Sequence, residues 1–387
     1  MKDKLISKRY WEDAATPMGA VDVLANQFDD VIDLGLGDPD LTTDLRIITP
    51  AFEDAKAGHT KYTEFRGDPE LRHEICKYYQ EDFGMEIKDE EVFVTAGGCI
   101  AMYLALEAIL NDGDEVIVQA PYFTPYKQQV ELARGVPVML DTFEEEAFQV
   151  QTRRIERLLT PRSRAMIINT PSNPTGACLT ADSLKTIAAI AKQRDLVVIA
   201  DDIYGAFSYE EPFVPMCSLE GMKERTITIN SFSKNFTMTG WRIANIIAPP
   251  GMVTVIQQIN ENLMFTAPSV SQRAAIYALR QRKEVQPPMI GEYKKRTFYS
   301  ASRINRIPNM SVLPPRATFY LFINIQKTGL TSEQVSDIIL KEAHIVTIPG
   351  TSFGACGEGF IRIACTVSVE TLKETFDRIE KVSIFQS

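Results

Sequence analysis

The segment EVFVTAGGCIAMYLALEAIL (91–110) contains a β-branched run, a glycine pair and an apolar helical pattern in direct succession. The same alternation continues downstream. Further short apolar runs lie at 115–119, 136–140, 165–169, 196–200, 226–230 and 243–248. Apolar strands separated by helices predict a largely parallel sheet covered on both faces. We therefore expect an α/β fold in which ligands bind beyond the carboxyl ends of the strands.

A smaller α+β unit is expected after this region. A long helical pattern begins after Pro249-Pro250-Gly251, and Pro287-Pro288 is expected to end it. Strands are then predicted at 319–325, 345–349 and 360–365, with helices near 331–343 and 369–383. Residues 1–45 are irregular and are expected to pack with the C-terminal unit. The predicted division is an N-terminal segment (1–45), a large cofactor-binding domain (46–285) and a small C-terminal domain (286–387).

Composition limits the partners and the compartment. The 387 residues include 41 Lys and Arg and 51 Asp and Glu, and the net charge of −10 argues against nucleic acid. No run approaches the roughly 20 apolar residues that cross a bilayer, and the N-terminal MKDKLISKRYWEDA lacks an apolar signal core. The six cysteines form no CxxC pair, and the three histidines lack metal-ligand spacing. We expect a cytoplasmic protein with no membrane partner and no metal site.

The segment SFSKNFTMTGWR (231–242) follows a predicted strand and carries the most informative side chains. A lysine amine there can form a Schiff base with a phosphorylated aldehyde cofactor. The Ser231 hydroxyl and the planar Arg242 guanidinium suit a phosphate dianion. Lys234 could equally be an ordinary surface lysine, and this segment alone favours neither interpretation.

The segment VVIADDIYG (197–205) ends an apolar strand with two aspartates, which are costly to bury without a partner. Asp201 could face a protonated pyridine nitrogen and keep the ring electron-withdrawing. Tyr204, three residues on, could donate to a ring oxygen. In the alternative, Asp201 and Asp202 cap the next element, which is the commoner role for such a segment taken alone.

Two further loops offer polar groups. In NTPSNPTGA (169–177), Asn173 could give a fixed amide donor to the same ring oxygen, although a plain turn would have the same composition. In the segment 91–110, Gly98 and Cys99 would offer backbone N–H groups at a helix N-terminus, where anions bind. Glycine-rich strand-to-helix turns are common, so this second signal is weak by itself.

Several motifs occur in an order that resembles the class I/II aminotransferases, which are fold-type I pyridoxal-phosphate enzymes. They are LGLGDPD (34–40), YTEFRGDPELR (62–72), APYFTPY (120–126), NTPSNPTG (169–176), ADDIYG (200–205), SFSK (231–234), GWR (240–242), FYLF (319–322), PGTSFG (349–354) and GFIRIA (359–364). The resemblance covers nearly the whole chain. It implies a mostly parallel seven-stranded sheet covered by helices, and a smaller α+β domain built from both chain ends.

The resemblance also implies roles for individual residues. Lys234 would form the Schiff base with pyridoxal 5′-phosphate and then move the proton during the reaction. Asp201 would hold the pyridinium, Asn173 and Tyr204 would bond the ring oxygen, and Phe123 would stack on the ring.

The phosphate and the substrate have their own expected partners. The phosphate contacts implied by the resemblance are Ser231, Arg242, Gly98, Cys99 and Tyr62, the last from a neighbouring subunit, so a homodimer with composite sites is expected. Arg362 would pair with the substrate α-carboxylate through two hydrogen bonds, with Asn173 and the Gly37 backbone close by.

The resemblance implies an aminotransferase that moves the amine of an L-amino acid to a 2-oxo acid, with 2-oxoglutarate the expected acceptor. A pyridoxal-phosphate-dependent C–S β-lyase or related eliminating enzyme is the alternative, because the same residues serve both reactions. A non-catalytic regulator is disfavoured by the acidic charge and by the absence of room for a DNA-binding module.

The amino donor stays open among aromatic amino acids, alanine, aspartate and acylated diamino acids. Cys99 occupies the position where similar bacterial aspartate transaminases carry a lysine for the side-chain carboxylate, which disfavours a strong dicarboxylate preference. Phe123, Tyr126 and Phe236 could favour apolar or aromatic substrates, or could simply pack in the core.

Overall fold

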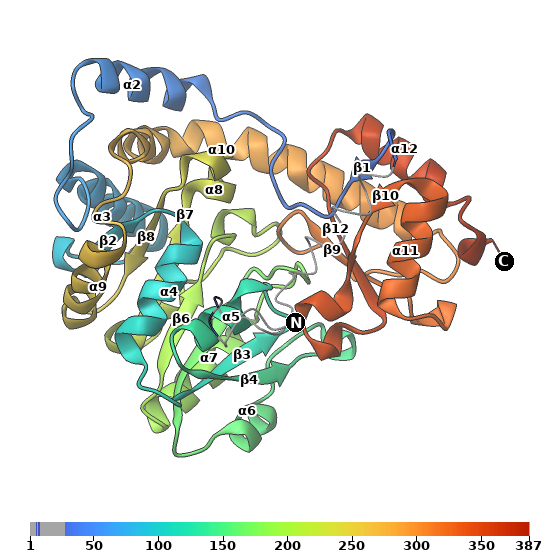
Figure 1. Ribbon diagram of the computed structural model, residues 1–387, viewed down its shortest axis with the longest axis horizontal. Helices are drawn as coiled ribbons and strands as arrows, with labels where there is room; N and C mark the ends of the chain where they lie inside the picture. The colour runs from blue at the N-terminus through green and yellow to red at the C-terminus, as the bar shows by residue number, and fades with distance from the viewer. Residues whose placement is uncertain (1–4, 6, 8–27, 387) are drawn as a thin grey trace.

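The computed structural model describes residues 28–386 together with residues 5 and 7 (Figure 1). Most of the predicted N-terminal segment (1–45) therefore lies outside the described residues. Within the described residues, no helix combines the length and apolarity needed to cross a membrane.

A seven-stranded sheet forms the centre of the larger part of the molecule, with the strand order β2-β8-β7-β6-β5-β3-β4. The strands are β2 (Val92–Thr95), β3 (Glu115–Ala120), β4 (Val136–Asp141), β5 (Ser163–Asn169), β6 (Val197–Asp201), β7 (Thr226–Ser231) and β8 (Ala244–Ile247). Every neighbouring pair is parallel except those made by β8, which runs antiparallel to β2 and β7. The predicted mostly parallel α/β sheet is confirmed.

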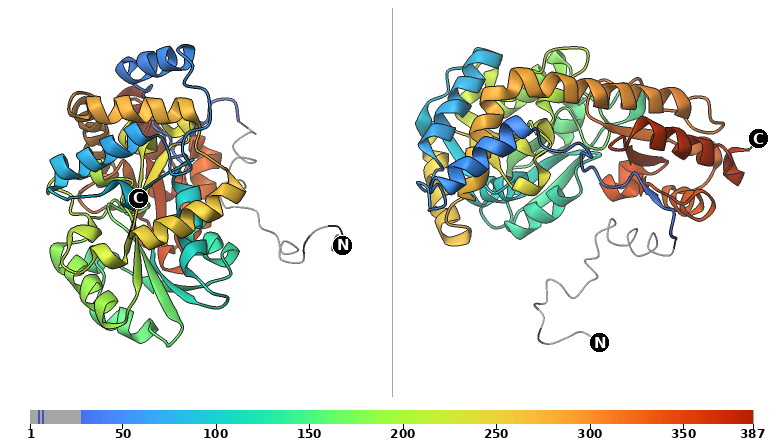
Figure 2. Two further views of the ribbon diagram at one scale, coloured as in Figure 1. Left: turned by 90° about the vertical axis from the view of Figure 1, so that its left-hand side faces the viewer. Right: turned by 90° about the horizontal axis from the view of Figure 1, so that it is seen from above.

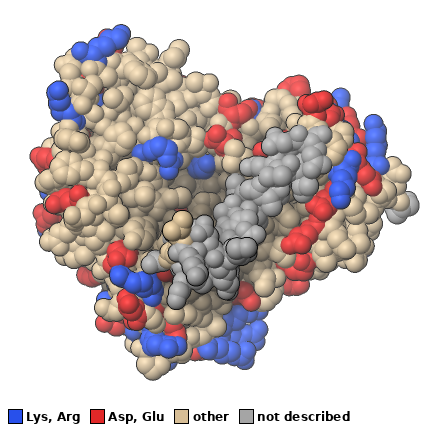
Figure 3. All heavy atoms as spheres, viewed as in Figure 1, with Lys and Arg blue, Asp and Glu red and all other residues tan. Residues whose placement is uncertain are grey.

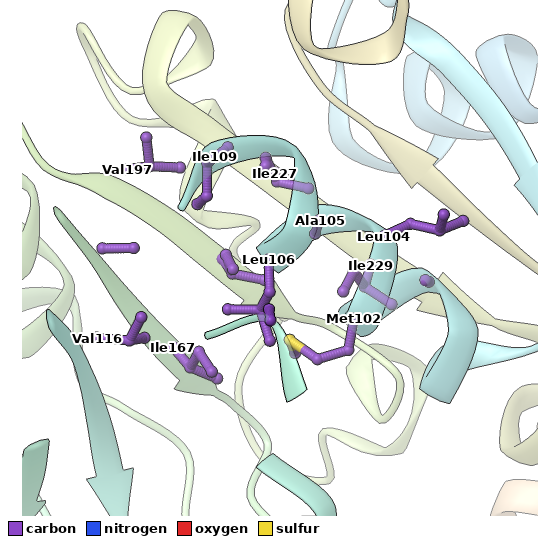
Figure 4. Packing of buried hydrophobic residues seen from close by; sticks show 14 of the residues in the cluster. Met102, Leu104, Ala105, Leu106, Ile109, Val116, Ile167, Val197, Ile227 and Ile229 are labelled. Carbon is purple, nitrogen blue, oxygen red and sulfur yellow. The ribbon is translucent and has the colours of Figure 1, made fainter. Parts of the chain in front are cut away.

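Both faces of this sheet are covered by helices. They include α4 (Gly98–Ile109), α5 (Pro125–Leu132), α6 (Thr152–Leu158), α7 (Ala181–Gln193) and α9 (Pro250–Leu263). Successive strand residues point to opposite faces, so Val116 packs with α4 while Ile117 packs with α7. Figure 4 shows the first of these cores, in which Met102 and Leu106 lie near strand residues of the sheet.

A second, smaller unit lies at the other end of the molecule. Its antiparallel sheet has the order β11-β12-β9, formed by β9 (Tyr320–Asn324), β11 (Ile348–Pro349) and β12 (Phe360–Ala364). Two helices, α11 (Ser332–Ala343) and α12 (Val369–Ile379), pack with it. The predicted strand at 345–349 is two short strands, because β10 (Ile345–Val346) pairs with β1 (Ile32–Asp33) instead. This pairing joins the two ends of the chain in one unit, as expected.

The helix α10 (Ser269–Ile304) contradicts the prediction that Pro287-Pro288 ends a helix. Both prolines are exposed, and so are Lys283 and Glu284, whose carbonyls lose their helical donors and can bond water instead. Packing of the buried Val285 and Met289 holds the helix together across this point. Figure 2 shows α10 running from the large part to the small unit, so this helix crosses the predicted boundary at 285/286. The three-part division stays a prediction.

The remaining helices complete the large part. They are α2 (Leu45–Lys56), α3 (Pro69–Phe83) and the short α8 (Phe232–Asn235). Three strands end close together, because Asn169 of β5 pairs with Asp201 of β6, and Asp201 pairs with Ile229, two residues before β7 ends at Ser231. The polar residues that follow these strand ends therefore meet at one edge of the sheet.

Candidate active site

A cavity of about 270 Å³ lies at this edge of the sheet. All predicted site residues except Tyr62 line it, namely Gly37, Gly98, Cys99, Phe123, Asn173, Asp201, Tyr204, Ser231, Lys234, Arg242 and Arg362. Figure 3 shows this face of the molecule hollowed between its two parts, with Lys or Arg side chains at the hollow. Among the described residues, no cluster of His, Cys, Asp and Glu is arranged to hold a metal ion.

Lys234 enters the cavity from α8, directly after β7. Its Nζ donates a hydrogen bond to the Gly37 carbonyl oxygen at 2.5 Å. Burial, opposed by the Asp38 charge and assisted by the Arg362 and Arg242 charges, lowers the pKa of Lys234 to about 8. The neutral fraction of this amine near physiological pH is therefore far larger than that of an ordinary lysine, and a neutral amine is a nucleophile. Lys234 is not an ordinary surface lysine.

The segment bearing Gly37 is held across the cavity by long-range contacts. Asp40 accepts hydrogen bonds from Arg296 at 2.7 Å and from Tyr293 at 3.0 Å, and both donors belong to α10. The Gly37 backbone also lies close to Tyr320, because a Cβ atom at this position would be 1.8 Å from the Tyr320 hydroxyl. The long helix thus fixes a segment that comes from the other end of the chain.

Asp201 is buried at the end of β6. Its Oδ2 accepts a hydrogen bond from the Tyr126 hydroxyl, and its Oδ1 accepts one from the Ile203 N–H at 3.3 Å. Burial raises the pKa of Asp201 to about 6, and these two hydrogen bonds hold it below what burial alone would give. A cation placed beside Asp201 would keep it ionised.

Asp202 differs sharply from its neighbour. It is buried away from the cavity, and its Oδ2 has no hydrogen-bond partner among the described residues. Burial and the Asp201 charge raise the pKa of Asp202 well above its usual range, so the surroundings favour the neutral form of this carboxyl. The two aspartates therefore face different environments, although they are adjacent in the chain.

Two buried asparagines and two tyrosines form further hydrogen bonds in and beside the cavity. Asn169 donates through Nδ2 to the Asp201 carbonyl at 2.9 Å, and its Oδ1 accepts the Asn173 N–H at 2.8 Å. The Tyr204 hydroxyl donates to the Tyr320 hydroxyl at 3.1 Å. Burial raises the pKa of Tyr204 well above its usual value, so Tyr204 keeps its proton.

The anion-binding prediction corresponds to one corner of the cavity. Helix α4 begins at Gly98 without a side-chain cap, which leaves the first N–H groups free for an anion. Gly97 has φ of 95°, and a Cβ there would lie 2.4 Å from Arg242 Nη2. Ser231 adds its hydroxyl, which bonds the Ser233 hydroxyl at 3.0 Å. Cationic, hydroxyl and backbone donors thus converge as a phosphate requires.

Arg362 is buried between two aromatic rings. Its guanidinium carbon lies 4.6 Å from the centre of the Tyr320 ring and 4.9 Å from that of Phe353. Its Nη1 donates to Asn173 Oδ1 at 3.0 Å, its Nη2 donates to the Gly35 carbonyl, and its Nε has no partner among the described residues. A buried, permanently charged group with an unused donor suits a carboxylate ligand.

Several cavity residues were not predicted as site residues. Tyr126 was considered only for substrate preference or packing, yet it bonds Asp201 and its ring meets Phe123 at 5.6 Å. No helical spacing links the two rings, because Tyr126 lies in α5 and Phe123 precedes this helix. Gln129 also lines the cavity, and its Nε2 donates to the Cys99 carbonyl at 2.9 Å. Phe236 packs in the core instead, stacked on Phe232.

Tyr62 lies outside the cavity of its own chain. Its side chain is 78% exposed, and its ring lies edge-on against Phe265 with 4.9 Å between the ring centres. Tyr62 is therefore a surface residue of its own chain.

Known proteins resemble this chain along nearly its whole length. The sequence pattern of the family described as aminotransferase class I and II matches residues 29–379. An aspartate aminotransferase of Pyrococcus horikoshii is 38% identical over 360 residues, which cover 92% of each chain. Aromatic-amino-acid aminotransferase 2 of Thermococcus litoralis is 37% identical over 363 residues, which cover 93% of each chain.

A solved structure has the same fold. The crystal structure of an aromatic aminotransferase from Pyrococcus horikoshii OT3 matches with a TM-score of 0.89 and 36% sequence identity. The match covers 94% of this chain and 98% of that one. The shared fold therefore includes both the large sheet and the smaller unit.

Proposed function

This chain belongs to the family of class I and II aminotransferases, and we propose that it performs transamination with pyridoxal 5′-phosphate held at Lys234. The enzyme moves the amino group of an amino acid to a 2-oxo acid, and 2-oxoglutarate is the acceptor we propose. The observation that carries the proposal is the placement of a buried lysine in one cavity with Asp201, Arg242 and Arg362.

The donor set of the cavity fits this cofactor. The uncapped start of α4, Ser231 and Arg242 suit the phosphate group, and the close approach of Gly97 to Arg242 leaves no room for a larger residue. The carboxyl of Asp201 suits a ring nitrogen, because a pyridinium would relieve the cost of burying the carboxylate. Phe123 supplies an apolar ring face for stacking.

Pyridoxal phosphate, when bound, supplies an aldehyde that condenses with amines and a ring that withdraws electrons from the substrate Cα. The residues of this chain position and protonate the reacting groups. Lys234 supplies the amine and, once free, accepts and returns a proton at the substrate Cα, because its lowered pKa suits both steps near neutral pH. Tyr204 keeps its proton, and its hydroxyl, turned away from Tyr320, would donate a hydrogen bond to the ring oxygen together with Asn173.

Arg362 holds the substrate α-carboxylate. The stacking of its guanidinium between Tyr320 and Phe353 fixes the plane of the fork, and Asn173 fixes its rotation. A two-bond pair with a carboxylate then orients the Cα–H bond for proton removal by Lys234. The same contacts serve the amino donor and the 2-oxo acid acceptor, because both carry this carboxylate.

The active unit we propose is a homodimer in the cytoplasm. Tyr62 supports the dimer, since its exposed ring is available to a second copy of the chain. The six cysteines, all within the described residues, are free thiols, which suits a reducing compartment. We further propose that Cys99 weakens any preference for dicarboxylate donors, because it brings no positive charge to the cavity.

A substrate panel tests the proposal. The purified protein with added pyridoxal phosphate is incubated with 2-oxoglutarate and each of many L-amino acids, and both glutamate and pyruvate with ammonia are measured. We expect glutamate to form with at least one donor, and the Lys234→Ala variant to form none. Pyruvate and ammonia without glutamate would instead establish the eliminating reaction. Glutamate formation by Lys234→Ala at the normal rate would refute the role of Lys234.

A further inference from the structure

Phe265 makes the ring contact that holds Tyr62 at the surface. We infer that Phe265 is a positioning residue for the composite site, orienting Tyr62 so that its hydroxyl reaches the cofactor phosphate bound by the partner subunit. This inference rests on the proposed homodimer and on the proposed role of Tyr62.

Residues close in sequence to each of these two rings form hydrogen bonds with one side chain of α10. Gln272 is fully buried, and its Nε2 donates to Thr63 Oγ1 at 3.1 Å and to the Ala267 carbonyl at 2.8 Å. Its Oε1 accepts the Asp68 N–H at 2.6 Å. The segment that carries Tyr62 and the turn that carries Phe265 are therefore held in a fixed relation.

Phe265 has a backbone conformation that large residues rarely adopt. Its φ is 69°, where glycine or asparagine would be easier to accommodate. Asn260, itself 2% exposed, secures this turn: its Nδ2 donates to the Phe265 carbonyl at 3.1 Å, and its own carbonyl accepts the Phe265 N–H at 2.9 Å. Such strain persists where the surroundings enforce it, often at functional sites.

The ring of Phe265 is 41% exposed, so burial in the core does not explain its presence. The ring instead lies between two other aromatic rings. It meets Tyr62 at 4.9 Å with an angle of 71°, and Phe65 at 5.1 Å with an angle of 88°. The contact with Phe65 holds the Phe265 ring, and the edge-on contact with Phe265 restricts the rotation of the Tyr62 ring.

The Tyr62 hydroxyl has no hydrogen-bond partner within residues 28–386, whereas its ring is fixed by Phe265. A fixed ring with a free hydroxyl is suited to a ligand outside its own chain. A phosphate dianion accepts hydrogen bonds strongly. A site whose tyrosine hydroxyl is held in the correct orientation therefore binds the phosphate more tightly than a site whose tyrosine rotates freely.

The test compares two probes that differ only in the phosphate. Cofactor-free protein is titrated with pyridoxal phosphate and with pyridoxal, and binding is followed by visible absorbance. We expect Phe265→Leu to weaken pyridoxal phosphate binding about three- to tenfold, from the loss of one edge-on ring pair, and to leave pyridoxal binding unchanged. Phe265→Tyr, which keeps the ring, should bind both probes normally.

A double-mutant cycle links Phe265 to Tyr62. In the Tyr62→Phe background, Phe265→Leu should cause no further loss, because the hydroxyl to be oriented is absent. The control is Phe298→Leu, since Phe298 is 40% exposed and packs on Tyr209 far from Tyr62 in the sequence. This control should bind both probes like the unmodified protein.

The outcomes separate this inference from the proposal beneath it. If Tyr62→Phe binds pyridoxal phosphate normally, the role of Tyr62 fails and the inference fails with it. If Tyr62→Phe weakens binding but Phe265→Leu does not, only the inference is overturned. The same holds if the losses of affinity caused by the two substitutions add independently in the double variant. Equal weakening of both probes, or a monomeric Phe265→Leu in sedimentation, would also overturn it.

Discussion

At the scale of single residues, burial shifts the two central ionisable groups of the cavity toward their neutral forms. Burial raises the pKa of Asp201 to about 6 and lowers that of Lys234 to about 8. The carboxyl is then ready to be stabilised by a cation, and the amine is ready to react as a nucleophile. Both groups are thereby brought closer to neutral pH, where each can change its protonation state.

The adjacent aspartates give the first prediction. Asp201→Ala should reduce turnover about 100-fold, the loss typical of one electrostatic partner in an active site, because Asp201 lines the cavity. Asp202→Asn should reduce it less than about tenfold, since an amide replaces a carboxyl whose neutral form is favoured by burial and which lies away from the cavity. Steady-state rates at saturating cofactor measure both. Equal losses of turnover would mean that Asp201 is not the aspartate that acts on the cofactor ring.

The second prediction concerns pH. Because the pKa of Lys234 is lowered to about 8, its proton leaves at a lower pH than that of a free lysine. Capture of pyridoxal phosphate by the cofactor-free protein should therefore slow about tenfold for each pH unit below 8 and level off above it. Stopped-flow absorbance measures the rate.

The control for this experiment is Nα-acetyl-lysine, which keeps a free side-chain amine. Its rate of reaction with pyridoxal phosphate should keep rising toward pH about 10.4. A midpoint for the protein near that of the free amino acid would contradict the burial of the amine.

At the scale of elements, the start of α4 and Arg242, two residues before β8, depend on each other. Helix α4 opens without a side-chain cap, and Gly97 allows Arg242 to approach its first turn. Since β2 and β8 are neighbours in the sheet, their ends bring these two groups together. The corner of the cavity that we propose for the phosphate is thus formed by the antiparallel pairing of β8 with β2.

Substitution of Gly97 gives the third prediction. Gly97→Ala should weaken pyridoxal phosphate binding about 10- to 100-fold, the range for one lost charge-assisted hydrogen bond, because the added Cβ would displace Arg242. Gly58→Ala is the matched control, since Gly58 also has positive φ, of 106°, and its Cβ would meet nothing within 4 Å. Thermal unfolding of both variants measures the backbone strain that they share. Cofactor titration should show weaker binding only for Gly97→Ala, where the added Cβ clashes with Arg242.

At the scale of the whole molecule, α10 connects parts that are distant in the sequence. One stretch of it contacts α2 and α3, and another contacts α12 and β9. It also holds Asp40 through Arg296, which places the Gly37 segment over Lys234. A single rigid helix therefore links the large sheet, the smaller unit and the exposed segment that carries Tyr62.

Subunit complementation gives the fourth prediction. Lys234→Ala and Tyr62→Ala are each expected to be poorly active, and a mixture with exchanged subunits should recover activity. A heterodimer has one site with both lesions and one intact site, so random exchange should restore about one quarter of the unmodified activity. Mass spectrometry of tagged subunits verifies exchange, and Lys234→Ala mixed with itself is the control. Exchange without recovery would place Tyr62 outside any composite site.

The sequence by itself determined the strands of the large sheet and most of the helices that cover it. Hydrophobic periodicity is local and reports which segments form a covered parallel sheet, and the lysine and the aspartates stand beside strand ends that must share an edge. Their roles as cofactor and substrate contacts stay predictions. The boundaries of single strands could also be predicted closely, because turn residues lie next to them.

Only the tertiary structure decided the contacts between residues far apart in the chain. Tyr126 bonds Asp201 from 75 positions away, and Arg362 bonds Asn173 from 189 positions away. The difference between Asp201 and Asp202, the passage of α10 through two prolines, and the exposure of Tyr62 likewise depend on what packs around each residue. Burial and partner geometry arise from the whole fold, so local sequence patterns carry no direct record of them.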